Sequence, residues 1–534
     1  MNSGRALLCL AFLGVGSCVG FSASPIAGSV KDDKGNLLNG VFVSAKRAGA
    51  TYTVTVFSDD AGEFRFPDDM GEGSYTVTAH AGGFQADQRT NVGVKAGETK
   101  RLDFSLREET RPEEQFRQAT PGEWLASVPG TEQEKRSIVR HCSGCHHTLR
   151  QLMVHRFDKD GWLKVVAAME RVDAIGVPRT VEGAGARSLP QQVTAPGQWH
   201  FASREEIAEY LAKVRGPGIP FPKIKFHPRP AGKATQAIIT EYQLPRENAV
   251  PHDVVLDPEG NAWYNDFKTD YLGKINPKTG EIKEFKLPTT APPKHPGSAN
   301  MIYGEDGHVW VEQRIAGRTV RFDAKREKVA AIYPGISVDR VDAKRNVALG
   351  TNMQLDINTG KILRYKYNDS TDGYGSAVDS RGFGYRGGIR DSDVKVLNPE
   401  TGEVKRYLTP TPDSGPRRIS LEGDAILWFG EWLGGKIGKL EIKTGKITEY
   451  SVSVPYAAFY EAGVDAKNHN AWAFDWHNDR LVRVNSRTGE VTEYPMPTPD
   501  VESRRTAVDS STNPPSVWIH GAGNGLIIRV QAPL

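Results

Sequence analysis

An internal repeat fills the second half of the chain and leaves few folds open to it. Thr-Gly turns recur at intervals of 80, 42, 43 and 44 residues, at Thr279, Thr359, Thr401, Thr444 and Thr488. Each turn precedes a short strand in which apolar and polar residues alternate, and the first interval holds two units. Units of roughly 36–47 residues have the period of the four-stranded blades of a β-propeller.

A second recurring position, which we call the landmark, lies in the middle of each unit. It occurs seven times, so the repeat has seven units. The residues at this position are Trp263, Trp310, Ala348, Gly384, Trp428, Trp472 and Trp518. Residues 238–245 match the last strand of the repeat yet precede the first unit, whereas the final unit ends at Val530 without such a strand. A strand from one end that completes the blade begun at the other would remove two open sheet edges. The sequence therefore predicts a seven-bladed propeller over residues 236–534.

The amino-acid sequence of this repeat resembles that of the streptogramin B lyase (virginiamycin B lyase) family over residues 238–530. The resemblance is carried by residues 409–416, 427–432, 434–440 and 447–450. It implies a seven-bladed propeller whose lyase activity depends on two histidines, a glutamate and a magnesium ion. At the matching positions this chain has Arg417, Val454 and Tyr456. Because the imidazole base and the metal-holding carboxylate are missing, the resemblance does not carry the lyase activity over.

Residues that open each blade are expected to ring the central channel and to form a candidate ligand site. They include His252, Asp253, Arg417, Arg418 and Tyr456, with Glu431 at a turn beside them. One interpretation is a solvated rim whose charges pair among themselves. The other is an anionic or sugar-like ligand held on the side of Arg417 and Arg418.

A C-x-x-C-H motif stands before the propeller, at Cys142, Cys145 and His146. In the haem c attachment motif the two thiols add to the haem vinyl groups and the histidine binds the iron. A redox dithiol is expected beside a βαβ pattern, which is absent here, and a structural zinc needs further ligands at regular spacing; a chance match is the third alternative. We expect one covalent haem c.

The sixth iron ligand is predicted to be Met169. Trp162, Val165, Val166 and Met169 share one face of a helix, and Met169 either fills the core or points its thioether at the iron. The next candidate is His200. Residues 120–216 resemble a cytochrome c domain in the attachment motif and in the final helix, which opens on a Ser-x-x-Glu capping box and stops at a glycine.

Residues 25–107 alternate between short strands and turns, and about seven strands in this length predict a β-sandwich. Residues 59–66, 73–79 and 83–84 carry a resemblance to the carboxypeptidase regulatory-like (transthyretin-like) module. That resemblance implies a role in adhesion or spacing. A proline-rich linker is predicted at 217–235.

The N-terminal 24 residues read as a secretory signal peptide, because an apolar run follows Arg5 and small residues follow the run. Residues 15–18 loosely match a lipoprotein-processing box, so a lipid anchor at Cys18 is the alternative to a free exported protein. No later run is long enough to span a membrane. The 68 Lys+Arg and 65 Asp+Glu residues are interspersed. The sequence therefore does not predict a basic patch that would bind nucleic acid.

Together these features predict a multidomain, mainly β, periplasmic protein: an N-terminal β-sandwich, a small α-helical cytochrome c domain and a C-terminal seven-bladed β-propeller. The expected function is electron transfer by one haem c, with a propeller that binds a redox partner protein or a small-molecule electron donor or acceptor. The alternative is a propeller enzyme, either a streptogramin-type lyase or a dehydrogenase that passes electrons to the haem. A sugar- or envelope-binding module with a vestigial haem is the third hypothesis.

Overall fold

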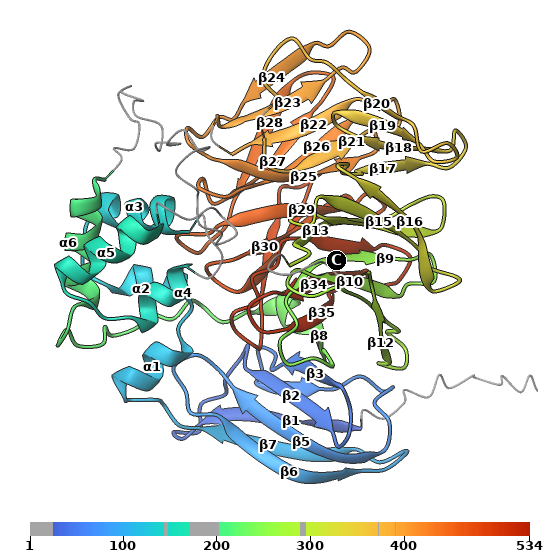
Figure 1. Ribbon diagram of the computed structural model, residues 1–534. Coiled ribbons are helices and arrows are strands. Elements are labelled where there is room, and N and C mark those ends of the chain that lie inside the picture. Colours follow the sequence, from blue (N-terminus) through green and yellow to red (C-terminus); the bar gives the residue numbers. More distant parts are fainter. Residues whose placement is uncertain (1–24, 144–147, 170–201, 289–294, 372, 390) are drawn as a thin grey trace, which may run out of the picture.

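The computed structural model describes residues 25–143, 148–169, 202–288, 295–371, 373–389 and 391–534 (Figure 1). The predicted signal peptide with Cys18, as well as Cys145, His146 and His200, lie outside the described residues. The described chain forms a β-sandwich, a group of helices and a ring of β-sheets, in that order. No helix in these ranges has the length and apolarity needed to cross a bilayer.

The N-terminal part is a β-sandwich of two sheets, which confirms the predicted fold of this segment. One sheet has the order β4-β1-β7 and the other contains β3-β2-β5-β6. Alternate residues such as Val30, Val43, Val77 and Phe104 point inward and are buried, as expected for strands with one solvated face. The strands are β1 (Ile26–Asp32), β2 (Phe42–Arg47), β3 (Tyr52–Phe57), β4 (Glu63–Arg65), β5 (Gly73–His80), β6 (Asp87–Val94) and β7 (Lys100–Leu106).

The helices follow the sandwich, and local sequence fixes where three of them begin. Thr120, Thr131 and Ser203 each form a capping box with a glutamate three residues later. The helices are α1 (Pro112–Gln118), α2 (Pro121–Ser127), α3 (Glu132–Cys142), α4 (Thr148–Val154), α5 (Lys159–Met169) and α6 (Arg204–Arg215). We call residues 112–216 the helical domain. Its core contains Trp124, Ile138, Met153, Trp162 and Leu211.

The ring consists of seven antiparallel four-stranded blades within the described residues, as the repeat predicted. Blade 1 is β9 (Pro251–Leu256), β10 (Ala262–Asp266), β11 (Tyr271–Ile275) and β12 (Ile282–Lys286). Blade 2 is β13 (Ser298–Tyr303), β14 (His308–Gln313), β15 (Arg318–Asp323) and β16 (Lys328–Pro334). Blade 3 is β17 (Arg340–Asp342), β18 (Val347–Gly350), β19 (Met353–Asp356) and β20 (Ile362–Arg364).

Blades 4 to 6 have the same strand order as the first three. Blade 4 is β21 (Ser376–Val378), β22 (Gly384–Gly388), β23 (Asp393–Leu397) and β24 (Val404–Leu408). Blade 5 is β25 (Pro416–Glu422), β26 (Ile426–Glu431), β27 (Lys436–Glu441) and β28 (Lys446–Ser451). Blade 6 is β29 (Phe459–Asp465), β30 (Asn470–Asp475), β31 (Arg480–Asn485) and β32 (Val491–Pro495).

Blade 7 joins the two ends of the ring. It contains β33 (Thr506–Asp509), β34 (Ser516–Gly521), β35 (Leu526–Gln531) and, as its outer strand, β8 (Ile238–Gln243) from the start of the propeller sequence. This confirms the predicted closure. The landmark residues lie on the second strand of every blade, and the tryptophans among them are buried.

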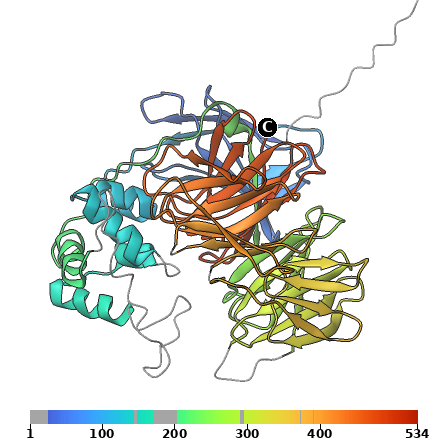
Figure 2. The ribbon, with the colours of Figure 1, turned by 90° about the horizontal axis from the view of Figure 1, so that it is seen from above.

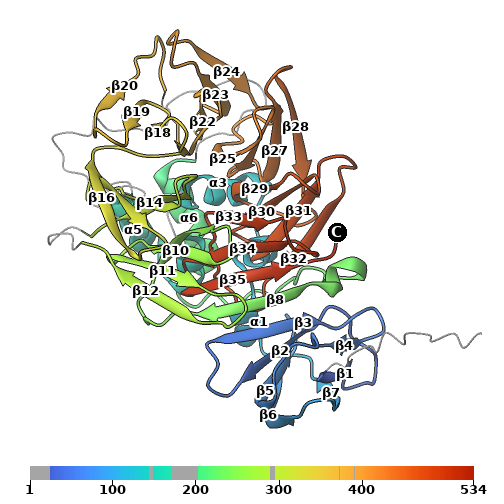
Figure 3. The ribbon, with the colours of Figure 1, turned by 90° about the vertical axis from the view of Figure 1, so that its right-hand side faces the viewer.

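The outer edge of β8 is covered by the sandwich, a feature that the repeat did not predict. Strand β3 pairs with β8 in an antiparallel ladder from Tyr52↔Tyr242 to Thr55↔Ile239. Blade 7 and one sandwich sheet thereby form a single eight-stranded sheet. Figure 3 shows the ring with the sandwich below β8 and the helices behind the blades. The linker is mostly irregular and contains one 3₁₀ turn, η1 (Gly232–Gln236).

Candidate functional site

The described part of the C-x-x-C-H motif lies against the propeller. Cys142 is the last residue of α3, and its partly buried side chain packs on the apolar core of the helical domain. The next residue, Ser143, donates a hydrogen bond to the carbonyl of Val139 and accepts one from the indole Nε1 of Trp432 at 3.0 Å. Residues Ser143 and Trp432 are both buried. A propeller side chain therefore holds the residue between the two motif cysteines.

Further contacts dock the helical domain on blades 5 to 7. The guanidinium of Arg140 lies 3.1 Å from the carboxylate of Asp413, and Arg150 pairs with Asp500 at 2.6 Å. Tyr456 Oη donates to Glu132 at 2.8 Å. Figure 2 shows the helices beside the orange and red blades, whereas the yellow blades extend away from them. One of the positions that the lyase resemblance makes catalytic, Tyr456, thus contacts the chain's own helices.

Helix α5 presents the predicted apolar face, but its last residue is not in the core. Trp162 is buried, and Val165 and Val166 pack on the helical domain's core while partly exposed. Met169 is 43% exposed at the end of α5. Met153, on α4, is fully buried instead. The role of Met169 as an iron ligand stays a prediction.

Two observations fit a haem attached at this place. The thiol of Cys142 lies beside an apolar cluster, the surroundings in which thioether-linked haems are held. In addition, Trp162 Nε1 is buried and has no hydrogen-bond acceptor in the described chain. Buried donors are nearly always paired, so an acceptor such as a haem propionate would satisfy this one.

Trp432 is also part of a cluster of aromatic side chains in the propeller. We call this cluster the aromatic cage and define it as Tyr374, Trp432, Tyr460 and Trp476. The rings contact one another at centroid separations of 5.1–5.7 Å. The guanidinium carbon of Arg417 lies 4.6, 4.2 and 3.9 Å from the ring centroids of Tyr374, Trp432 and Tyr460. These are cation–π distances. Burial opposes ionisation of Tyr374, but the Arg417 charge and a hydrogen bond with Tyr460 lower its pKa to about 8.

The centre of the channel holds an ion network rather than an open rim. Asp253 is fully buried and accepts from Arg418 at 2.8 Å and from Arg505 at 3.1 Å. It also contacts His252 Nδ1 at 2.8 Å and accepts from the backbone N–H of Met301 at 3.3 Å. Burial outweighs the hydrogen bond between His252 and Asp253 and lowers the pKa of His252 to about 4, so this imidazole is neutral at pH 7. Burial opposes ionisation of Asp253, yet the two arginines keep its pKa well below the usual value.

The six residues proposed for the propeller site therefore separate into four places. His252, Asp253 and Arg418 come together in the ion network, and Arg417 sits in the aromatic cage. Glu431, fully buried at the end of β26, lies near Glu449 and Lys436; burial and the Glu449 carboxylate raise its pKa to about 9. Tyr456 belongs to the helical-domain interface.

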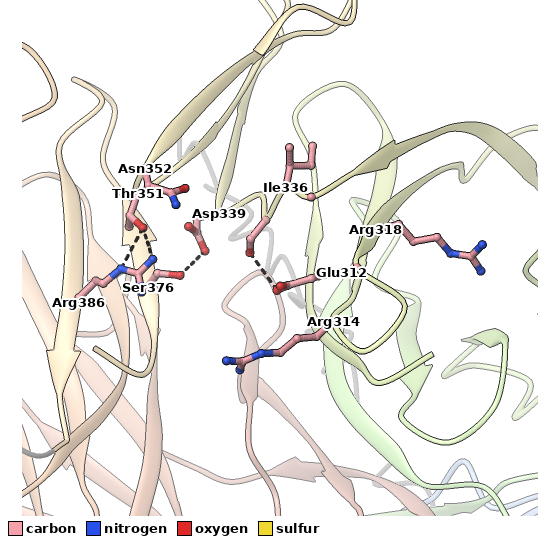
Figure 4. Close-up of a pocket in the computed structure, with 12 residues that line it drawn as sticks. Glu312, Arg314, Arg318, Ile336, Asp339, Thr351, Asn352, Ser376 and Arg386 are labelled. Carbon is pink, nitrogen blue, oxygen red and sulfur yellow. Dashed lines mark hydrogen bonds between the residues drawn. The ribbon is translucent and has the colours of Figure 1, made fainter. Parts of the chain in front are cut away.

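A pocket opens on the part of this propeller face that the helices leave uncovered. It lies between blades 2, 3 and 4 and has a volume of about 220 Å³. Figure 4 shows Glu312, Asp339 and Arg386 facing into it, while Arg318 points away. Ser337 donates to Glu312 at 2.9 Å and Ser376 to Asp339 at 2.7 Å. Burial raises the pKa of both carboxyls.

Reasoning from the sequence missed the cage and this pocket. A signal for part of the cage was present, since Trp432 and Trp476 directly follow Glu431 and Asp475 at equivalent repeat positions. Tyr374 and Tyr460 carry no comparable signal, because they come from the first strands or the loops before them in blades 4 and 6.

The fold and these contacts define a multidomain, mainly β protein with a propeller face capped by helices. Comparison with known families adds that residues 25–107 match the carboxypeptidase regulatory-like domain. Residues 396–526 match the virginiamycin B lyase family. The chain thus has a carboxypeptidase regulatory-like domain at its N-terminus and a virginiamycin B lyase-like propeller. A search of curated proteins finds no match.

Solved structures with a similar propeller are distant in sequence. Virginiamycin B lyase from Staphylococcus aureus has 21% identity and a TM-score of 0.47, covering 55% of this chain and 99% of its own. A streptogramin B lyase structure has 21% identity and the same TM-score, covering 57% and 100%. U3-55K has 11% identity and a TM-score of 0.45, covering 55% and 98%. Likeness at this level concerns the fold and says nothing of activity.

Proposed function

We propose that the chain is an exported, mono-haem c-type cytochrome that transfers electrons, with a propeller that binds a redox partner or a small ligand. The observation that carries the proposal is the setting of Cys142 and Ser143, at the end of α3, beside an apolar cluster and clamped by Trp432. Cys142 and Cys145 would bind the haem, and His146 and Met169 its iron. When bound, the haem supplies one-electron chemistry.

The chain's own residues then have two tasks. The apolar side chains around Cys142 would shield the attachment site from water, and Trp432 holds Ser143 by its hydrogen bond. The ion pairs Arg140–Asp413 and Arg150–Asp500 hold the helical domain in place on the propeller. Electron transfer needs no acid or base from these residues.

The pocket between blades 2, 3 and 4 is the place we assign to a small ligand. It lies on the same propeller face as the helical domain and is lined by carboxyls, hydroxyls and guanidinium groups. The dehydrogenase form of the enzyme alternative needs such a binding place for an electron donor, whereas the lyase form needs the two histidines and the glutamate that the resemblance implies and this chain lacks. The lyase positions are occupied by Arg417, Val454 and Tyr456, of which Arg417 is caged and Tyr456 is bonded to Glu132.

Expression in a host that matures c-type haem tests the proposal. We expect the intact mass to exceed that of the processed polypeptide by one haem, the reduced protein to show an α-band, and the colour to survive acid acetone. The double variant Cys142→Ala, Cys145→Ala should lose all three signals, whereas Ser143→Ala, which leaves both thiols, should keep them. A colourless wild-type protein with the bare polypeptide mass overturns the proposal.

A further inference from the structure

We infer that the caged guanidinium of Arg417 belongs to the haem site and raises the reduction potential of the haem, which makes the propeller part of the redox centre. This inference rests on the proposed function, because it requires the haem at Cys142. It goes beyond the proposed function because it assigns a role in setting the haem potential to Arg417, a propeller residue that forms none of the docking contacts described above.

The first step is proximity. In the proposed holoprotein Cys142 would hold the haem through a thioether bond, and the neighbouring residue Ser143 is hydrogen-bonded to Trp432 at 3.0 Å. The guanidinium carbon of Arg417 lies 4.2 Å from the centroid of the Trp432 ring. One aromatic side chain therefore separates a fixed positive charge from the residue beside the attachment point.

The second step is that no carboxylate compensates this charge in the described part of the chain. Arg417 is 2% exposed, and among the described residues no carboxylate forms an ion pair with it. Within the same residues its Nε and Nη1 atoms have no hydrogen-bond acceptor, and the Tyr374 hydroxyl that interacts with it has a pKa of about 8 and is mostly neutral at pH 7. The neighbouring Arg418, in contrast, pairs with Asp253 at 2.8 Å. The aromatic faces stabilise the Arg417 cation but leave its formal charge in place.

The third step is the effect of such a charge on the iron. Ferric haem carries one more positive charge than ferrous haem, so a nearby cation destabilises the oxidised form more than the reduced form. The interaction is strong where the surroundings exclude water, and burial and nearby charge are among the means by which proteins set haem potentials. Arg417 should therefore raise the potential.

Arg504 is a weaker second contributor. Its guanidinium carbon lies 5.1 Å from the centroid of Trp476, a neighbour of Trp432 in the cage. It is 3% exposed. Burial lowers its pKa, and the nearby carboxylate of Glu502 acts in the opposite direction. Since Glu502 offsets part of the charge, Arg417 is the residue to test first.

The test is a spectroelectrochemical titration of the full haem-loaded protein and four variants. Arg417→Gln and Arg417→Met remove the charge, and Met also fills the cage with an adaptable apolar chain; both should lower the midpoint potential. Arg417→Lys keeps the charge and should stay near the wild-type value. Arg483→Gln is the control, because Arg483 is equally buried but bonds Thr492 on blade 6, outside the cage.

The shift should persist in high salt, since mobile ions screen buried charges weakly. Equal potentials for wild type, Arg417→Gln and Arg417→Met, all with full haem content by mass, overturn the inference and leave the proposed function intact. A wild-type protein without haem overturns both. Should Arg417→Gln fail to fold, the comparison of Arg417→Met with Arg417→Lys decides the matter.

Discussion

At the scale of single residues, buried charges in the propeller differ in how they are compensated. Asp253 pairs with two arginines in the channel, and within each pair the carboxylate and the guanidinium stabilise each other's charge. Arg417 lies among aromatic rings and has no carboxylate partner among the described residues. Glu431 avoids the cost of a buried charge in a third way, because a pKa of about 9 keeps it protonated at pH 7.

Glu431→Gln should therefore show its effect through pH. In the wild type the folded pKa of Glu431, about 9, lies above the ordinary value of 4.5, so the native state holds a proton that the unfolded state has lost between these values. Stability falls as pH rises through that window. Glutamine does not titrate, so the variant should gain at least about 1 kcal/mol relative to wild type by pH 8.5, given about 1.4 kcal/mol per pKa unit.

Urea unfolding at pH 5 and pH 8.5 measures this difference. The two proteins should have similar free energies of unfolding at pH 5 and diverge at pH 8.5. Parallel pH profiles would show that the Glu431 carboxyl ionises normally in the folded protein.

At the scale of elements, the pairing of β3 with β8 converts two sheet edges into an internal ladder. Exposed edges invite association with other chains, and both strands gain backbone partners here. The sequence predicted each strand from its own alternation. It did not predict their pairing, because Thr53 and Glu241 meet across 188 residues and either strand could have met solvent instead.

Thr53→Pro tests the ladder. Strand β3 lies between β2 and β8, and a proline inside a sheet removes a donor and breaks the local pairing. We expect a loss of about 1–3 kcal/mol, the cost of leaving a buried backbone group unpaired. Thermal unfolding followed by circular dichroism measures the loss. Thr53→Ala keeps the backbone donor and should be nearly neutral; equal losses in both variants would place the effect in the side chain.

At the scale of the whole molecule, the helical domain covers blades 5 to 7 and leaves the pocket between blades 2, 3 and 4 open. The docking depends on a few polar contacts between segments that are far apart in the chain. Arg140–Asp413 is partly buried, with side chains 16% and 17% exposed. Such a pair contributes more than one in free solvent.

The double variant Arg140→Gln, Arg150→Gln should loosen this docking. Each lost charge-assisted hydrogen bond is worth about 1.5–3 kcal/mol at a partly buried site, so backbone amides in α3 and α4 should exchange faster in hydrogen–deuterium exchange mass spectrometry. Arg117→Gln is the control, since the exposed ion pair of Arg117 with Glu113 lies within α1. Unchanged exchange in the double variant would mean that apolar packing and the Trp432 contact alone hold the domain.

The sequence by itself determined the local and periodic features: the seven repeats, the sandwich strands, the helix start at Ser203, and the C-x-x-C-H spacing. These depend on residues close together in the chain, so their pattern is readable without a fold. Only the tertiary structure decided that Trp432 bonds Ser143, that Arg417 is caged while Arg418 is paired, and that Tyr456 contacts the helices. Those contacts join residues up to 324 positions apart, and the packing of whole domains, rather than any local pattern, brings them together.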